Sequence, residues 1–179
     1  MMAKSVWNLD TAHSSLEFSV KHMMISKAKG AFNDFDAVIE ADPEDLTDAK
    51  IEFSVDLSSI DTRNKDRDDH LRSSDFFDIE THPKMTFVAT DIKKKTGNNY
   101  DVSGNLTIRD TTKPVTVDVH FVGVSKDPMS GNEAAGFTGK TKISRKEFGL
   151  TWNVALETGG VLVGDEVTIN IEIEAQKQA

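Results

Sequence analysis

Histidine and aspartate are the residues of this chain best suited to metal binding or to acid–base chemistry. An imidazole and a carboxylate held together can ligate zinc or transfer a proton. None of these residues is paired at metal-ligand spacing, and the chain contains no HExxH pair, GxSxG elbow or glycine-rich phosphate loop. We therefore predict no metal site and no catalytic residue, with a small His/Asp-dependent hydrolase or isomerase as the alternative. The set comprises His13, His22, His70, His82 and His120 with Asp10, Asp69 and Asp78.

Five basic residues could hold an anionic or polar head group, or could simply be solvated charge: Lys21, Arg67, Arg109, Lys113 and Arg145. A guanidinium group suits a pyrophosphate because it donates two parallel hydrogen bonds. Arg67 and His70 are the best placed, since at helical spacing they share a face that also carries Leu71.

Most of the chain alternates between apolar and polar residues with the period of two that is typical of half-buried strands. About nine such runs with turn signals between them predict an antiparallel barrel or sandwich. A slip in the alternation near Phe32 and Phe35 predicts a β-bulge in a long, bent strand. The strong runs are 51–57, 100–108, 115–121 and 167–173, and the weaker ones are 14–22, 31–41, 84–90, 134–143 and 150–157.

The segment 64–73 is predicted to be the one substantial helix. Asn64 is a good N-cap, acidic residues occupy the first turn, and Arg72 lies at the C-terminal end. An isolated helix of this length is unstable in water, so it must pack on an apolar surface. Because Leu71, Phe76 and Phe77 are too apolar for solvent, we expect 64–77 to cover one barrel opening, either as a lid or as a fixed plug.

Composition limits the possible partners and compartments. The 179 residues fit a single domain, 1–179, and the formal charge of −9 argues against binding to nucleic acid. No apolar run is long enough to span a membrane, so we expect no membrane insertion. The N-terminus as written has no signal peptide, which predicts a cytoplasmic protein, or a periplasmic or secreted one if a signal was removed.

Four blocks of sequence, in register, resemble the YceI-like family of bacterial polyisoprenoid-binding, lipocalin-like proteins. They are WNLDTAHSSLEFSVKHMMISKAKGAF at 7–32, RDDHLRSSDFFDIETHPKMTF at 67–87, GNLTIRDTTKPVTVDV at 104–119 and ISRKEFGLTW at 143–152. The resemblance implies an all-β fold: an extended eight-stranded antiparallel lipocalin-like barrel that encloses a long tunnel.

The resemblance implies a non-enzymatic protein that binds, transports or stores a long-chain isoprenoid or similar lipid without a cofactor. A stress-related protein that sequesters foreign amphiphiles is a further alternative, and a homodimer is possible. The expected ligand-binding residues share the inward phase of their strands or the apolar side of the helical segment. They are Phe18, Val20, His22, Phe53, Val55, Arg67, His70, Leu71, Phe76, Phe87, Val119, Phe121, Phe137 and Trp152.

Overall fold

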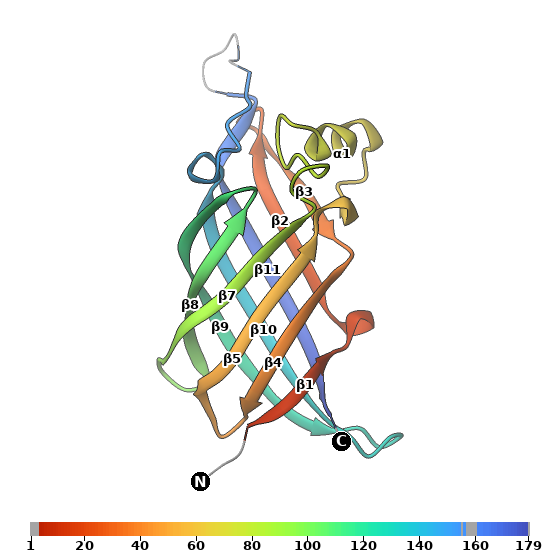
Figure 1. Cartoon of the computed structure of the whole chain (residues 1–179), viewed down its shortest axis with the longest axis vertical. Coiled ribbons are helices and arrows are strands. Elements are labelled where there is room, and N and C mark those ends of the chain that lie inside the picture. The colour runs from red at the N-terminus through yellow and green to blue at the C-terminus, as the bar shows by residue number, and fades with distance from the viewer. Residues whose placement is uncertain (1–3, 155, 157–160, 179) are drawn as a thin grey trace.

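In the computed structural model, an antiparallel β-sheet closes on itself to form an elongated barrel (Figure 1). The structure describes residues 4–154, 156 and 161–178. β1 pairs with β4 on one side and with β11 on the other, and this pairing closes the wall. The order around the barrel is β1 (Ser5–Leu9), β4 (Phe35–Asp42), β5 (Asp45–Asp56), β7 (Lys84–Lys94), β8 (Asn99–Ile108), β9 (Thr111–Lys126), β10 (Glu133–Ser144) and β11 (Val163–Lys177). The predicted eight-stranded antiparallel barrel is confirmed.

Three further strands extend the wall at one end: β2 (Ser15–His22), β3 (Ser26–Phe32) and β6 (Ile60–Asp61). The last strand, β11, pairs with β1 near its C-terminal end and with β2 over its preceding part. β2 then pairs with β3, and β3 with β6. The β2–β3 hairpin therefore rises to the end of the barrel that also carries the helix α1 (Figure 1).

The predicted bulge near Phe32 and Phe35 is wrong, because one strand ends there and another begins. β3 ends at Phe32, β4 begins at Phe35, and the sheet partner changes from β2 to β1 and β5. The two residues between them bond elsewhere: the Asn33 amide donates to Ser59 O (3.3 Å), and Asp34 O accepts from the Asp56 amide (2.9 Å). Backbone groups that leave a ladder must find other partners, and here the segment before α1 supplies them.

The predicted strand at 150–157 is also wrong over the residues that the structure describes, since 150–154 and 156 lie in no strand. Residues 155 and 157 lie outside the described residues. The carbonyls of Leu150 and Trp152 accept hydrogen bonds from the Arg145 side chain (2.6 and 2.9 Å). A side chain thus satisfies backbone groups that alternation alone would have assigned to a sheet.

The predicted helix is confirmed as α1 (Lys65–Arg72). The Asn64 side chain accepts a hydrogen bond from the Arg67 amide (3.0 Å), as expected of an N-cap. The buried Asp68 side chain accepts a hydrogen bond from the Thr62 amide (2.9 Å), and this bond connects the helix to the residues that precede it. Three short 3₁₀ helices accompany it: η1 (Thr11–His13), η2 (Leu57–Ser59) and η3 (Arg145–Phe148). Among the described residues, no helix is long and apolar enough to cross a membrane.

Candidate ligand-binding site

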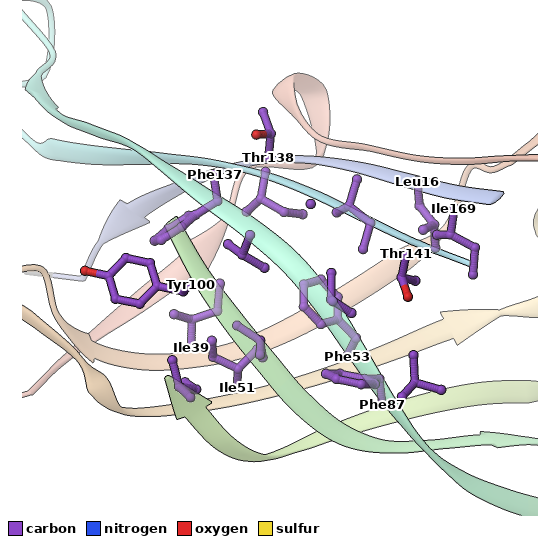
Figure 2. A pocket seen from close by; sticks show the side chains of 18 of the residues that line it. Leu16, Ile39, Ile51, Phe53, Phe87, Tyr100, Phe137, Thr138, Thr141 and Ile169 are labelled. Atoms are coloured by element: carbon purple, nitrogen blue, oxygen red, sulfur yellow. The ribbon is translucent and has the colours of Figure 1, made fainter. Parts of the chain in front are cut away.

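The interior of the barrel contains an apolar cavity of about 140 Å³. Its walls come from β2, β4, β5, β7, β8, β9, β10 and β11. The lining is aliphatic and aromatic, and its side-chain polar groups are the hydroxyls of Tyr100, Thr138 and Thr141. Figure 2 shows an elongated arrangement, with Tyr100 and Phe137 toward one end and Leu16 and Ile169 toward the other. Such a space can take up a hydrocarbon but offers it very few polar partners.

Five of the residues expected from the sequence line this cavity: Phe53, Val55, Phe87, Val119 and Phe137. Phe53 and Phe87 are direct cross-strand partners of β5 and β7, and their rings lie near each other in Figure 2. Space for the Phe87 ring depends on a glycine. A Cβ added at Gly104 would lie 2.6 Å from Phe87 Cζ and 2.4 Å from Val88 O, so no other residue fits there without a shift.

Further lining residues were missed, although most lay in recognised strands. Val115 and Val117 share the inward phase of Val119 on β9, and Ile169 and Ile171 do so on β11. Extending each inward phase along its whole strand would have found them. The β4 residues Phe35 and Ile39 were not predicted as lining residues, because 31–41 was treated as one long strand and not as the end of β3 followed by β4. The lining also includes Leu16, Ile51, Met85, Ile92, Tyr100, Val102, Leu106, Thr141 and Ile173.

A first aromatic cluster joins the α1 segment, which comprises residues 64–77, to residues 150–154. The His70 ring lies 4.6 Å from Trp152 and 5.1 Å from Phe76, and both contacts are edge-to-face. Phe76 is also in contact with Trp152, at 5.6 Å. His70, Phe76 and Trp152 thus come together as a group, although none of them lines the cavity.

A second aromatic cluster joins the α1 segment to the β2–β3 hairpin. The Phe18 ring lies 5.4 Å from Phe32, which in turn lies 6.0 Å from Phe77. Leu71 is half-buried against the same core. Phe121, which we expected at the site, is buried beyond the lining and stacks on Phe137 at 5.1 Å. The α1 segment is therefore fastened to the barrel end by aromatic packing on two sides.

The Arg67 guanidinium is partly engaged within its own segment. Its Nε donates to Thr62 Oγ1 (2.8 Å) and its Nη2 to Thr62 O (2.6 Å). A guanidinium has five N–H donors, so others are left for a ligand. On the same helix, Arg72 donates to Ser58 O and Ile60 O (both 3.1 Å). Both arginines thus brace α1 against the chain that precedes it.

His70 and His22, the two histidines expected to bind the ligand, lie at the same end of the barrel. His70 Nε2 lies 2.8 Å from Asp75 Oδ2. His22 and Val20 are half-buried on β2, where they pair with Ser26 and Ala28 of β3, away from the cavity lining. The expected polar residues are therefore spread along the end of the barrel and do not converge on one point.

Asp10, His13 and Glu174 form the closest grouping of potential metal ligands among the described residues, within 4.8 Å of one another. His13 Nδ1 lies 2.8 Å from Asp10 Oδ2 and 3.4 Å from Glu174 Oε2. The hydrogen bond to Asp10 raises the pKa of His13 and lowers that of Asp10. Because the His13 side chain is 68% exposed, we interpret the group as a surface ion-pair network joining η1 to β11.

A closed antiparallel barrel around one apolar cavity defines the class of small β-barrels whose interior can hold a single ligand. Within this class, the chain belongs to the YceI-like domain family, whose model matches residues 7–175. It is 45% identical to a UPF0312 protein of Staphylococcus epidermidis over 94% of this chain and 95% of the relative. A UPF0312 protein of Staphylococcus aureus is 42% identical over the same shares.

Solved structures agree with this assignment. Burkholderia cenocepacia BcnA superposes with a TM-score of 0.79 at 29% identity, covering 93% of this chain and 98% of that one. A YceI protein of Campylobacter jejuni gives 0.75 at 33% identity, covering 89% and 90%. A polyisoprenoid binding domain from Saccharophagus degradans gives 0.71 over 97% and 99%, and at 14% identity this likeness concerns the fold alone.

Proposed function

We propose that the protein binds a long-chain isoprenoid, or a similar amphiphilic lipid, inside the barrel and acts as a carrier or store, not as an enzyme. The observation that supports this most directly is the interior cavity with its hydrocarbon lining. Each methylene moved from water into such a space contributes about 0.8 kcal/mol. The lining has few groups that could bind or activate a polar substrate, which favours binding over catalysis.

The size of the cavity indicates how a long chain would enter. At about 140 Å³ it is comparable to a protein cavity that holds one benzene molecule. A prenyl chain of several units therefore requires the flexible side chains of the wall to move. Phe53, Phe87 and Phe137 are half-buried, and Met85 has the most adaptable side chain in the lining. We expect these side chains to change rotamer as the chain binds.

The fold shared with a polyisoprenoid binding domain supports an isoprenoid as the first ligand to test. Solvent extraction of the purified protein followed by mass spectrometry should recover a long-chain lipid in amounts approaching one per chain. Protein stripped of lipid should then take up prenyl alcohols. If extraction yields no apolar molecule and the stripped protein binds no prenyl alcohol, the proposal is wrong.

The polar end of the ligand should lie at the α1 end, with Arg67 as the first candidate to hold it. We expect Arg67→Ala to weaken binding of a prenyl pyrophosphate more than binding of the alcohol of equal length. Loss of one charge-assisted hydrogen bond costs roughly 1.5–3 kcal/mol, or about ten- to a hundredfold in affinity. Calorimetric titration with both ligands measures the difference.

Arg72→Ala is the matched control, since Arg72 also braces α1 through backbone carbonyls. It should lower the affinity for both ligands alike, or for neither. If Arg67→Ala does the same, then Arg67 only supports the helix, and Lys21 and Arg109 become the next candidates for the head-group site.

A further inference from the structure

The tip of the β2–β3 hairpin exposes three consecutive apolar residues at the α1 end of the barrel (Figure 1). Met23 is 44% exposed, Met24 51% and Ile25 84%. Single exposed apolar residues are common on protein surfaces, but a contiguous group often marks an interaction site. The three residues lie at a turn, where polar residues and glycine are the usual choice.

The backbone of this tip is in an unfavourable conformation. Met23 and Met24 have φ values of 54° and 62°, in the left-handed region that bulky residues avoid. The turn closes with the Ile25 amide donating to His22 O (3.3 Å), and asparagine followed by glycine would form such a turn without strain. Strain kept together with exposed apolar side chains points to a function for these side chains.

A segment that is hydrogen-bonded to the tip also exposes an apolar side chain. The Met23 amide donates to Leu162 O (2.8 Å), and the Leu162 amide donates to Val154 O (2.9 Å). Val154 is 47% exposed. Backbone hydrogen bonds thus link the tip, through Leu162, to a second exposed apolar side chain.

Three exposed lysines lie on the same hairpin, on the strands that lead into and out of the apolar tip. Lys21 and Lys27 are direct cross-strand partners, and Lys29 lies two residues further along β3. Like charges in this arrangement repel each other and destabilise the hairpin. Among residues 4–154, 156 and 161–178, none of the three has a carboxylate oxygen within 4.0 Å, although the protein has a net charge of −9. An anionic partner would relieve this repulsion.

We propose that the β2–β3 tip docks the protein peripherally on a lipid bilayer that contains anionic lipids. Met23, Met24 and Ile25 would enter the interface between head groups and acyl chains, and Lys21, Lys27 and Lys29 would contact the head groups. A convex tip of three side chains is too small for a stable protein interface, which buries about 800 Å² on each partner. A bilayer can accommodate such a tip, because lipid molecules rearrange around the inserted side chains. The proposal does not depend on the ligand in the cavity.

The test is co-sedimentation with vesicles that contain no prenyl lipid. The wild-type chain should sediment with vesicles of equal parts phosphatidylglycerol and phosphatidylcholine at low salt, and should stay in solution with phosphatidylcholine alone. Met24→Ser/Ile25→Ser should reduce binding by at least about tenfold. Lys21→Gln/Lys27→Gln/Lys29→Gln should reduce it on the order of a hundredfold, and salt should weaken wild-type binding.

Two control variants change the same kinds of side chain elsewhere: one exposed apolar residue in the first, and three lysines in the second. Met129→Ser removes an apolar side chain that is 94% exposed in the β9–β10 loop. Lys50→Gln/Lys93→Gln/Lys94→Gln changes the net charge equally on β5 and β7, where all three lysines are exposed. Both should bind mixed vesicles as the wild type does.

Three outcomes would overturn the proposal. The first is a wild-type chain that fails to sediment with the mixed vesicles. The second is a loss of binding in the controls as large as in the tip variants. The third is light scattering that finds a wild-type dimer which the tip variants lose, because the tip would then be a contact between copies of this chain. Thermal unfolding of each variant verifies that the exposed substitutions leave the fold intact.

Discussion

Replacing Val55 or Val119 by tryptophan is expected to abolish binding of long prenyl chains. Both valines line the cavity, on β5 and β9, so an indole ring at either position takes up space in a cavity of about 140 Å³. Excluding three methylenes alone costs about 2.4 kcal/mol, or roughly fiftyfold in affinity. Native mass spectrometry with geranylgeraniol measures the bound fraction.

The control for this experiment is Val122→Trp, on the outer face of β9, where the side chain is 62% exposed. It should bind the lipid as the wild type does. Val55 is only 4% exposed, so its tryptophan variant also overpacks the core at a cost of about 1–3 kcal/mol. Val119 is half-buried and should be the better tolerated of the two. A folded Val119→Trp variant with full affinity for the lipid would exclude the cavity as the binding site.

Arg145→Ala is expected to be strongly destabilising, although the residue lies outside the cavity lining. The residue is 3% exposed, and burial lowers its pKa, whereas the charge of Asp165 acts in the opposite direction. Its guanidinium donates to the carbonyls of Gly164 (2.8 Å), Leu150 (2.6 Å), Trp152 (2.9 Å) and Val163 (3.2 Å). The bond to Leu150 O is buried and the other three are part-buried, and Val163 O keeps a bond from Asn153 Nδ2 (2.7 Å). A carbonyl left unpaired away from water costs about 1–3 kcal/mol, so we expect a total loss of about 3 kcal/mol.

For a chain of this size, such a loss lowers the unfolding midpoint by about 6–12 °C. Thermal unfolding followed by circular dichroism measures it. Arg145→Lys should fall between the wild type and the alanine variant, since an ammonium group cannot reach all four carbonyls. Lys146→Ala, at the exposed next position, should unfold like the wild type. An unchanged midpoint in Arg145→Ala would show that water or the backbone can replace the guanidinium.

The helix and most strands were predictable because their signals are local. Asn64 caps α1 through a bond to a residue three positions later, and the alternation on β9 repeats every second residue. Both patterns depend only on the geometry of a few neighbouring residues. The lining residues Phe53, Val55, Phe87, Val119 and Phe137 follow from the same alternation, since one face of each barrel strand must point inward.

The errors arose where a residue distant in the sequence supplies the partner. Trp152 appeared to continue a strand, but its ring packs on His70 and Phe76, which are distant in the sequence. The interruption at Asn33 and Asp34 is stabilised by backbone groups of Ser59 and Asp56. No pattern within a short window contains these contacts.

The sequence by itself determined the all-β class, the position of α1, the inward faces of the long strands and, through its four blocks, the family. Only the tertiary structure decided that β1 closes the wall against β11, that the predicted aromatic residues divide between the cavity and two clusters at the α1 end, and that Met23, Met24 and Ile25 protrude. The physical reason is that alternation and capping depend on near neighbours, whereas closure, cavity shape and exposure depend on which distant segments pack together.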